Sequence, residues 1–310
     1  MGITWLFARS AVAAVALTAG GTARASEHAD DRLTVGVGGI IAPDYEGSND
    51  TVIRPAFGAL ARFRGHNIAF KGTSLSVDLV PEYADQKFKI VVAPFANLNF
   101  DRSDQPRDPV VGLIRKRKVA LEMGATVGVT WNGVITSKYD SLTIQVSASH
   151  DVGTVSKSYI ITPTVQYLTP LNEKSLVGAS LSADFVGGRY ARYYFGVGPN
   201  ASTASGLPIF APSGGLKSAS LGLMGAYALG HNLNHGFALG ALFNYERLFG
   251  DFARTPLVAT RGSRGQFVGA LGWVTRSERL RTSQQAPGRS GQRGYAQKAR
   301  NRTIPFARIG

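Results

Sequence analysis

The chain has no cysteine, and this absence excludes several classes of protein at once. Disulfide-stapled scaffolds, zinc and iron–sulfur sites with cysteine ligands, and thiol catalysis all need that residue. Charged residues are also few, at 17%. After the N-terminal 25 residues, no segment approaches 18 uninterrupted apolar residues. A helical inner-membrane protein is therefore excluded. With 44% hydrophobic residues, the chain is still too apolar to be disordered as a whole.

Glycine is the residue that the chain has in excess. It supplies 37 of the 310 residues, well above the usual fraction of about 7%. This excess indicates tight turns and closely approaching strands rather than helices. The length fits one large all-β or barrel domain, or two ordinary domains.

The formal net charge of +14 suggests nucleic-acid binding only until its distribution is considered. The last 35 residues carry eight arginines and Lys298 against Glu278, and the first 25 add Arg9 and Arg24. The body from Ser26 to Thr275 is only mildly basic, so we expect no nucleic-acid partner.

Both ends of the chain differ from its body. Residues 1–25 read as a secretory signal peptide, with an apolar run from Ala11 to Leu17 and Ala23-Arg24-Ala25 as the small-x-small cleavage site. A membrane anchor is the alternative, but the run is shorter than the roughly 20 residues that span a bilayer. Residues 276–310 have no hydrophobic periodicity and are predicted to be a disordered Arg-rich tail. A basic arm for anionic polymers or lipid headgroups is the functional alternative for this tail.

The body is dominated by alternation with a period of two, which is typical of β-strands. From Val119 to Trp131, every odd position is apolar, and the even positions are Ala, Glu, Gly or Thr. No segment has a convincing helical period. The pattern predicts about twelve strands: Leu33–Ile41, Ile53–Phe63, Leu75–Pro81, Phe88–Phe100, Val119–Trp131, Leu142–Ala148, Tyr159–Tyr167, Val177–Phe185, Tyr193–Val197, Ala219–Leu229, Phe237–Tyr245 and Phe267–Trp273.

Several of these strands have 9 to 13 residues, the length of membrane-spanning strands rather than of strands in soluble sandwiches. Their second face is small and polar, which suits a wet lumen. A soluble protein with its apolar face turned inward would show the same alternation. Export, strand length, aromatic residues near strand ends and the lack of cysteine favour an all-β, antiparallel outer-membrane barrel of about 10–12 strands over residues 26–275.

Long Gly/Pro-rich connections are predicted where such a barrel has its loops: Pro43–Asp50, Asp101–Lys118, Gly198–Gly215 and Gly250–Gly265. The second contains the basic run Arg115-Lys116-Arg117-Lys118. This run could hold lipopolysaccharide phosphates or an acidic partner, or it could be an ordinary solvated loop beside a membrane.

Several short motifs together resemble the MltA-interacting protein (MipA/OmpV) family of outer-membrane proteins. The resemblance covers about Leu33 to Val274, and it rests on the order and spacing of the motifs. They are Pro43-Asp44-Tyr45-Glu46-Gly47-Ser48, Val119-Ala120-Leu121-Glu122-Met123-Gly124, Arg192-Tyr193-Tyr194-Phe195-Gly196-Val197, Gly214-Gly215-Leu216, Tyr245-Glu246-Arg247-Leu248-Phe249-Gly250-Asp251 and Thr255-Pro256-Leu257-Val258.

The resemblance implies a barrel of the Gram-negative outer membrane without known catalytic residues. Some members of the family are described as scaffolds that join a lytic transglycosylase to a peptidoglycan synthase. The implied partners are outer-membrane lipid, including lipopolysaccharide, and peptidoglycan-remodelling enzymes. The family-motif residues are interpreted as structural: Pro43, Tyr45, Gly47, Ser48, Tyr194, Phe195, Gly196, Val197, Gly250, Asp251 and Pro256.

Two of these motifs have a direct physical interpretation. Gly47 can take the positive φ of a tight turn, and Gly196 lets a strand bend or pack closely. The neighbouring rings of Tyr193, Tyr194 and Phe195 are expected on both faces of a strand end, as in an interfacial girdle.

Catalytic groups are sparse, and we predict no catalytic residue, no cofactor and no metal site, so that the protein is not an enzyme. His231 and His235 flank a predicted turn rather than lying on a helix that would align them. His150 lies near Ser147 and Ser149 but has the opposite parity in its strand, so these side chains should point apart.

Three functions therefore remain open: an envelope scaffold, a narrow pore for small solutes, and an outer-membrane hydrolase using His150. The scaffold rests on the family resemblance, and the pore rests on the Gly/Ser/Thr inner face. The hydrolase is the least supported of the three.

Overall fold

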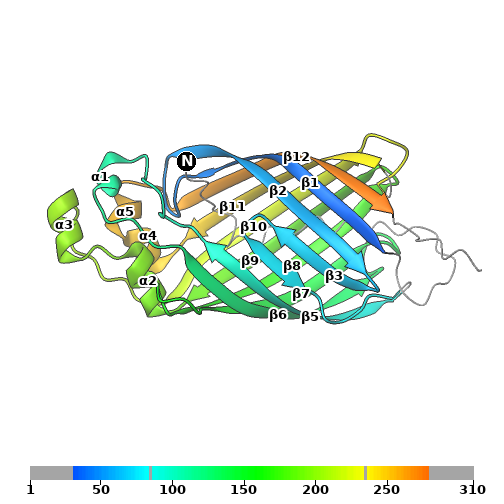
Figure 1. Cartoon of the computed structure of the whole chain (residues 1–310), viewed down its shortest axis with the longest axis horizontal. Helices are drawn as coiled ribbons and strands as arrows, with labels where there is room; N and C mark the ends of the chain where they lie inside the picture. The colour runs from blue at the N-terminus through cyan, green and yellow to red at the C-terminus, as the bar shows by residue number, and fades with distance from the viewer. Residues whose placement is uncertain (1–30, 84–85, 234–235, 279–310) are drawn as a thin grey trace, which may run out of the picture. The chain divides into compact units, whose positions relative to one another are not determined.

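The described part of the chain is a closed, twelve-stranded antiparallel β-barrel (Figure 1). The computed structural model describes residues 31–83, 86–233 and 236–278. The strands are β1 (Arg32–Pro43), β2 (Thr51–Phe63), β3 (His66–Lys71), β4 (Ser74–Val77), β5 (Phe88–Asn99), β6 (Ala120–Asn132), β7 (Ser141–Asp151), β8 (Tyr159–Asn172), β9 (Ser175–Val186), β10 (Gly215–Ala228), β11 (Gly236–Leu248) and β12 (Gly265–Glu278).

The barrel closes where the first strand pairs with the last. Arg32 of β1 is opposite Glu278 of β12, and the ladder continues to Ile41 opposite Gly269. Every other strand pairs with its neighbours in sequence. The start of β1 and the end of β12 lie at the same end of the barrel, here called the terminal end, and the opposite end is called the loop end. The predicted fold class, including a strand number of about 10–12, is confirmed.

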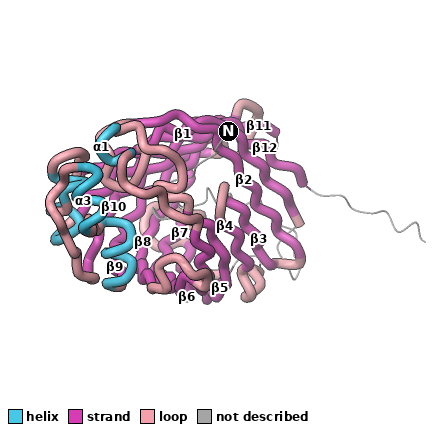
Figure 2. Tube along the Cα trace, turned by 60° about the vertical axis from the view of Figure 1, so that its left-hand side comes forward, coloured by secondary structure: helices cyan, strands magenta, loops and turns pink. Residues whose placement is uncertain are grey.

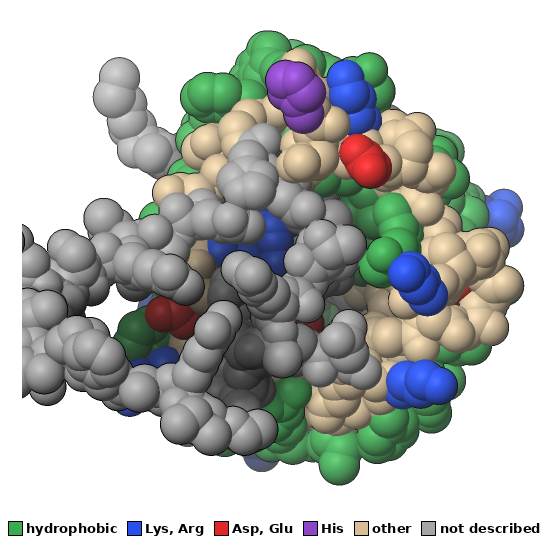
Figure 3. Space-filling model, turned by 90° about the vertical axis from the view of Figure 1, so that its right-hand side faces the viewer, with side chains coloured by type: hydrophobic (Ala, Val, Ile, Leu, Met, Phe, Trp, Pro, Cys, Tyr) green, Lys and Arg blue, Asp and Glu red, His purple; other side chains and the backbone are tan. Residues whose placement is uncertain are grey.

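The outer face of the barrel is apolar, as the alternation predicts. Val37 and Trp273, which are opposite one another in β1 and β12, are 57% and 54% exposed. Exposed Leu, Ile, Val and Phe side chains continue on the neighbouring strands, and Figure 3 shows hydrophobic side chains around the rim of the terminal end. Apolar surface facing outward on every side is stable only in lipid, so the protein is an outer-membrane barrel.

Among the described residues, no helix has the length and apolar character needed to cross a membrane.

In the described part of the chain, five short helices lie together at the loop end (Figures 1 and 2). They are α1 (Pro109–Gly112), α2 (Gly188–Phe195), α3 (Pro199–Ser205), α4 (Gly250–Arg254) and α5 (Pro256–Ala259). The expectation of an all-strand body was wrong here, because helices of four to eight residues are too short to show a clear period. The predicted strand Tyr193–Val197 is wrong for the same reason: Tyr193 to Phe195 form the last turn of α2.

One strand was missed. The six residues of β3, His66–Lys71, form a short hairpin with β4, whose pairing with β5 covers only Ser74 to Ser76. The last strand extends beyond the predicted Trp273 to Glu278. The predicted leader, residues 1–25, and residues 279–310 of the predicted tail lie outside the described residues.

Candidate functional site: a cap that closes the loop end

The family motifs converge in the loop end of the barrel, although they are far apart in the sequence. We call the connections 44–50, 100–119, 187–214 and 249–264 the cap. Tyr45, Val197 and Leu257 pack in one buried apolar cluster of the cap. Tyr194 and Phe195 pack in a second cluster with Val258. The motifs therefore share one packed structure, which is consistent with their structural interpretation.

Gly47 forms the turn that brings the β1–β2 connection against α5. Its φ of +95° confirms the predicted left-handed turn. A Cβ atom at this position would lie 2.5 Å from Cγ2 of Val258, so the turn also needs the absence of a side chain. Ser48, the next residue, is buried and pairs with Gly262 in an isolated bridge.

The aromatic motif lies in a helix, which corrects the expected interfacial girdle. Tyr194 and Phe195 are 2% and 1% exposed in α2, and they face the interior of the cap. The ring of Phe195 contacts that of Phe252 edge-on, with centroids 5.1 Å apart. Gly196 ends the helix at a negative φ of −79°, and a Cβ there would collide with the carbonyl oxygen of Arg192. Glycine is thus required at position 196 because the backbone passes close to Arg192 at the helix end, and not because a strand bends there.

Beneath the helices lies a buried ion cluster centred on Lys217 of β10. The Lys217 side chain is fully buried, and its Nζ forms an ion pair with Glu46 of the cap. It also lies 3.0 Å from Oδ2 of Asp184 and 3.3 Å from Oε1 of Glu246. Tyr190 of α2 donates a hydrogen bond to the second carboxylate oxygen of Glu46. One ammonium group therefore joins two strands of the wall to the cap.

A β-bulge places Lys217 in this position. Leu216 is opposite Phe185 and Ser218 is opposite Asp184, so Lys217 is an extra residue in β10. An extra residue in one strand redirects a side chain that regular alternation would turn to the other face. The bulge therefore allows Lys217 and its neighbour Ser218 both to be buried.

A second polar contact joins the wall to the aromatic core. Glu122 of β6 accepts hydrogen bonds from the side-chain amides of Asn97 and Asn99 on β5. The Asn99 amide also donates to the hydroxyl of Tyr194, at 3.0 Å. Because all of these groups are buried, loss of one would remove hydrogen bonds from a site that excludes water.

The cap loops are fixed to one another by carboxylates. Asp108 accepts the N–H groups of Val110 and Val111 at the start of α1 and binds the guanidinium of Arg261. Burial acts to raise the pKa of Asp108, but these hydrogen bonds outweigh it and lower that pKa. Asp251 likewise has a lowered pKa, because Arg254 and Ser213 donate to its carboxylate.

The basic run folds back onto the aromatic helix. The Arg117 guanidinium lies over the ring of Tyr193, 4.9 Å from its centroid, and the Lys118 N–H donates to the Tyr193 hydroxyl. Burial and the nearby Arg102 lower the pKa of Arg117 to about 10. Arg115, Lys116 and Lys118 are exposed, so the run presents three cations to the surface.

The hydrolase candidates are separated in the structure. His150 is exposed on the outer face, whereas Ser147 and Ser149 line a cavity in the lumen, as their parity predicts. His231 is exposed in a connection, and His235 lies outside the described residues. Within the described ranges, no group of three or more His, Asp or Glu side chains is placed to hold a metal ion.

Sequence reasoning missed the polar residues that hold the cap together. Lys217 occupies a position that the alternation of its strand assigns to the apolar face. This mismatch was the only indication of its role in the sequence. Thr255 was noted only as part of a motif, but it is fully buried, and its hydroxyl donates to the carbonyl oxygen of Phe195 at 2.6 Å.

The chain is similar to one protein family and, at low identity, to several solved structures. No curated protein matches the sequence. Among solved structures, an outer-membrane channel from Pseudomonas putida F1 is 13% identical, covering 83% of this chain and 100% of its own, with a TM-score of 0.42. OmpT of Vibrio cholerae is 11% identical over 82% of this chain and 99% of its own, with a TM-score of 0.35. The toluene transporter TodX of Pseudomonas putida is 10% identical over 80% of this chain and 89% of its own, with a TM-score of 0.31. The family described as MltA-interacting protein MipA matches residues 35–275, so the chain belongs to that family.

Proposed function

We propose that this outer-membrane barrel is an envelope scaffold that binds peptidoglycan-remodelling enzymes, rather than an enzyme itself. The observation that carries the proposal is the closed cap, in which the buried cluster at Lys217 and the aromatic core fill the loop end. A barrel closed in this way is a rigid body suited to holding partners. The family description, which names interaction with MltA, supports the same function.

The partner surface is expected at the terminal end. In outer-membrane barrels the short turns face the periplasm and the long loops face outside. The connection 133–140 at the terminal end presents Ile135, which is 65% exposed. Asp140 accepts the backbone N–H groups of Val134, Ile135 and Thr136, so this connection is held in one shape.

Site-specific photo-crosslinking in intact envelopes tests this function. A benzoylphenylalanine at Ile135 should form an adduct with a lytic transglycosylase or a peptidoglycan synthase, identified by mass spectrometry. The matched control is the same residue at Ile209, which is 63% exposed in the cap and should form no such adduct. Absence of peptidoglycan enzymes from the Ile135 adducts, or equal yields at both positions, would contradict the proposal.

The small-solute pore is the second candidate, and a cavity in the lumen favours it. This cavity measures about 610 Å³ and is lined by Thr, Ser and Gln side chains on several strands. Conductance of the refolded barrel in a planar bilayer distinguishes the two functions. A steady open-channel current would support the pore, and a silent bilayer would support the closed scaffold.

A further inference from the structure

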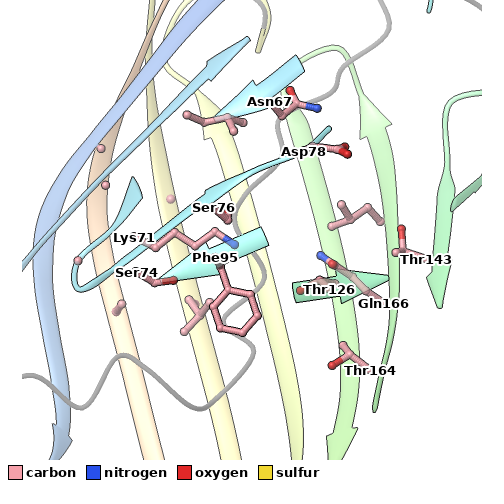
Figure 4. Close-up of a pocket in the computed structure, with 18 of the residues that line it drawn as sticks. Asn67, Lys71, Ser74, Ser76, Asp78, Phe95, Thr126, Thr143, Thr164 and Gln166 are labelled. Carbon is pink, nitrogen blue, oxygen red and sulfur yellow. The ribbon is translucent and has the colours of Figure 1, made fainter. Parts of the chain in front are cut away.

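The lumen cavity has two unlike walls. Strands β1, β2, β11 and β12 contribute mostly glycine and apolar side chains to one wall, among them Gly36, Ala56, Gly58, Leu60, Leu242 and Gly272. The facing strands β6, β7 and β8 contribute hydroxyl and amide groups, among them Thr126, Thr143, Thr164 and Gln166 (Figure 4). A cavity of about 610 Å³ falls within the range of small-molecule sites.

Lys71 places a positive charge in this cavity. It is opposite Gly58 in the β2–β3 ladder, and Figure 4 shows its side chain extending into the cavity near Phe95. The other two lysines that point into the described barrel, Lys89 and Lys217, form ion pairs with carboxylates. Lys71 forms no ion pair or hydrogen bond with any described residue.

A second donor faces the same space. Nε2 of Gln166 is buried and has no hydrogen-bond partner in the described structure. Gln166 lines the cavity from β8, and its amide is drawn pointing into it (Figure 4). A buried donor without a partner costs about 1–3 kcal/mol, and a ligand oxygen in the cavity would remove that cost. The cavity thus offers an ammonium group and an amide N–H, both donors.

The barrel wall is incomplete beside Lys71. The β2–β3 ladder covers Gly58 to Phe63, and its last pair is Gly58 with Lys71. One further hydrogen bond follows this pair, from the N–H of Gly72 to the carbonyl oxygen of Phe57. In the described structure, Thr51 to Phe57 of β2 therefore pair with β1 on one side and with no strand on the other. Figure 2 shows the short β3 and β4 between the longer β2 and β5.

The residues at this edge suit contact with lipid. Pro55 has the same parity as Phe57, so its missing N–H is on the side without a partner strand, where a proline costs least. Ile53 is 77% exposed, and the rings of Phe57 and Phe70 lie 5.7 Å apart on the outer face. Because Phe57 and Gly72 also line the cavity, the cavity reaches the wall at an apolar edge.

We propose that the lumen cavity binds an amphipathic organic anion, with its carboxylate at Lys71 and its apolar body against the apolar wall formed by β1, β2, β11 and β12. The Lys71 ammonium, which has no partner among the described residues, selects for negative charge, and the Gln166 amide donates to a further oxygen. The apolar edge at Ile53 and Phe57 matches a ligand that comes from the membrane. This site does not depend on the scaffold function, since it lies in the lumen.

The test uses the refolded full chain in lipid nanodiscs, with 11-(dansylamino)undecanoate as the fluorescent probe and its methyl ester as the uncharged control. The wild-type protein should bind the acid more tightly than the ester. Lys71→Met should weaken binding of the acid about tenfold and leave the ester unchanged, because one charge-assisted contact is lost. Lys71→Arg should retain binding, and Lys174→Met, in an exposed turn, should match the wild type.

A second variant tests the cavity itself. A Cβ at Gly36 would meet only ordinary contacts, the shortest at 3.6 Å from Val274, so Gly36→Val should fold and fill part of the space. It should weaken the acid and the ester together. Heat-modifiable gel migration confirms that each variant is folded. Equal binding of acid and ester by the wild type, or a Lys71→Met protein that binds the acid normally, would overturn the proposal.

Discussion

Lys217 and Asp184 lie on adjacent strands, and their ammonium and carboxylate groups are 3.0 Å apart in the buried cluster beneath the cap. Removing one member of a buried ion pair leaves the other charge without compensation. Lys217→Met should therefore lower the free energy of unfolding by about 3–5 kcal/mol. Urea unfolding in lipid vesicles measures this loss, and the exposed Lys174→Met is the control. A stability equal to the wild type would show that the cluster does not support the cap.

Gly47 is expected to be a sensitive glycine of the cap, because its left-handed turn packs against Val258. Gly47→Ala combines a left-handed φ with a contact 2.5 Å from Val258, and it should cost about 1–3 kcal/mol of unfolding free energy. Gly206→Ala, at φ +73° with open space around its Cβ, is the matched control and should cost only about 1 kcal/mol. If the two variants lose equal stability, the packing against Val258 contributes nothing.

The barrel wall could be predicted from the sequence because a strand shows its pattern within its own residues. The count of twelve, however, included two errors that cancel. Tyr193–Val197 alternates well enough to resemble a strand, but tertiary packing of Tyr194 and Phe195 holds it in α2 and the following bend. In contrast, β3 has only six residues and pairs with only part of β2. So few residues show only a weak alternation of apolar and polar side chains.

The candidate site was harder to predict than the wall, because its contacts join distant residues. Glu46 and Lys217 are 171 positions apart, and only the closed fold brings them together. Periodicity cannot indicate a bulge that turns one lysine inward. The motif residues were identified, but their common location was visible only in three dimensions.

The connection 133–140 should lose stability in acid. Asp140 is fully buried; burial acts to raise its pKa, but the N–H groups of Val134, Ile135 and Thr136 and the hydroxyl of Tyr167 lower it well below the usual range. A carboxylate with a lowered folded pKa stabilises the fold fully above its unfolded pKa of about 3.9 and loses this effect as the pH falls toward the folded value.

Amide hydrogen exchange of residues 133–140 measures this effect. Protection in the wild type should be constant from about pH 7 to pH 5 and should fall below about pH 4. Asp140→Asn should lack protection at every pH, because the neutral amide is a weaker acceptor for several N–H groups. Protection in the wild type that does not change down to pH 2 would contradict the role of Asp140.

The exposed cations of the basic run are expected to bind lipopolysaccharide phosphates. The combined variant Arg115→Gln, Lys116→Gln and Lys118→Gln keeps Arg117, whose guanidinium packs on Tyr193. Its affinity for lipopolysaccharide micelles should fall, and the wild-type affinity should decrease with added salt, because surface charges are screened. Dephosphorylated lipopolysaccharide is the control ligand. Equal binding of both ligands by the wild type would show that phosphates are not recognised.

The position of chain truncation should decide whether the barrel closes. Removing residues 279–310 leaves every β12 pair intact and should not change heat-modifiable migration or the unfolding midpoint. Truncation after Val274 also removes Thr275 to Glu278, which pair with Arg32 to Val35 of β1. This shorter chain should lose the folded band or unfold at a lower urea concentration, because four pairs of the closing ladder are gone. Equal behaviour of the two truncated chains would mean that closure does not need the end of β12, and loss of folding in both would assign a role in assembly to residues 279–310.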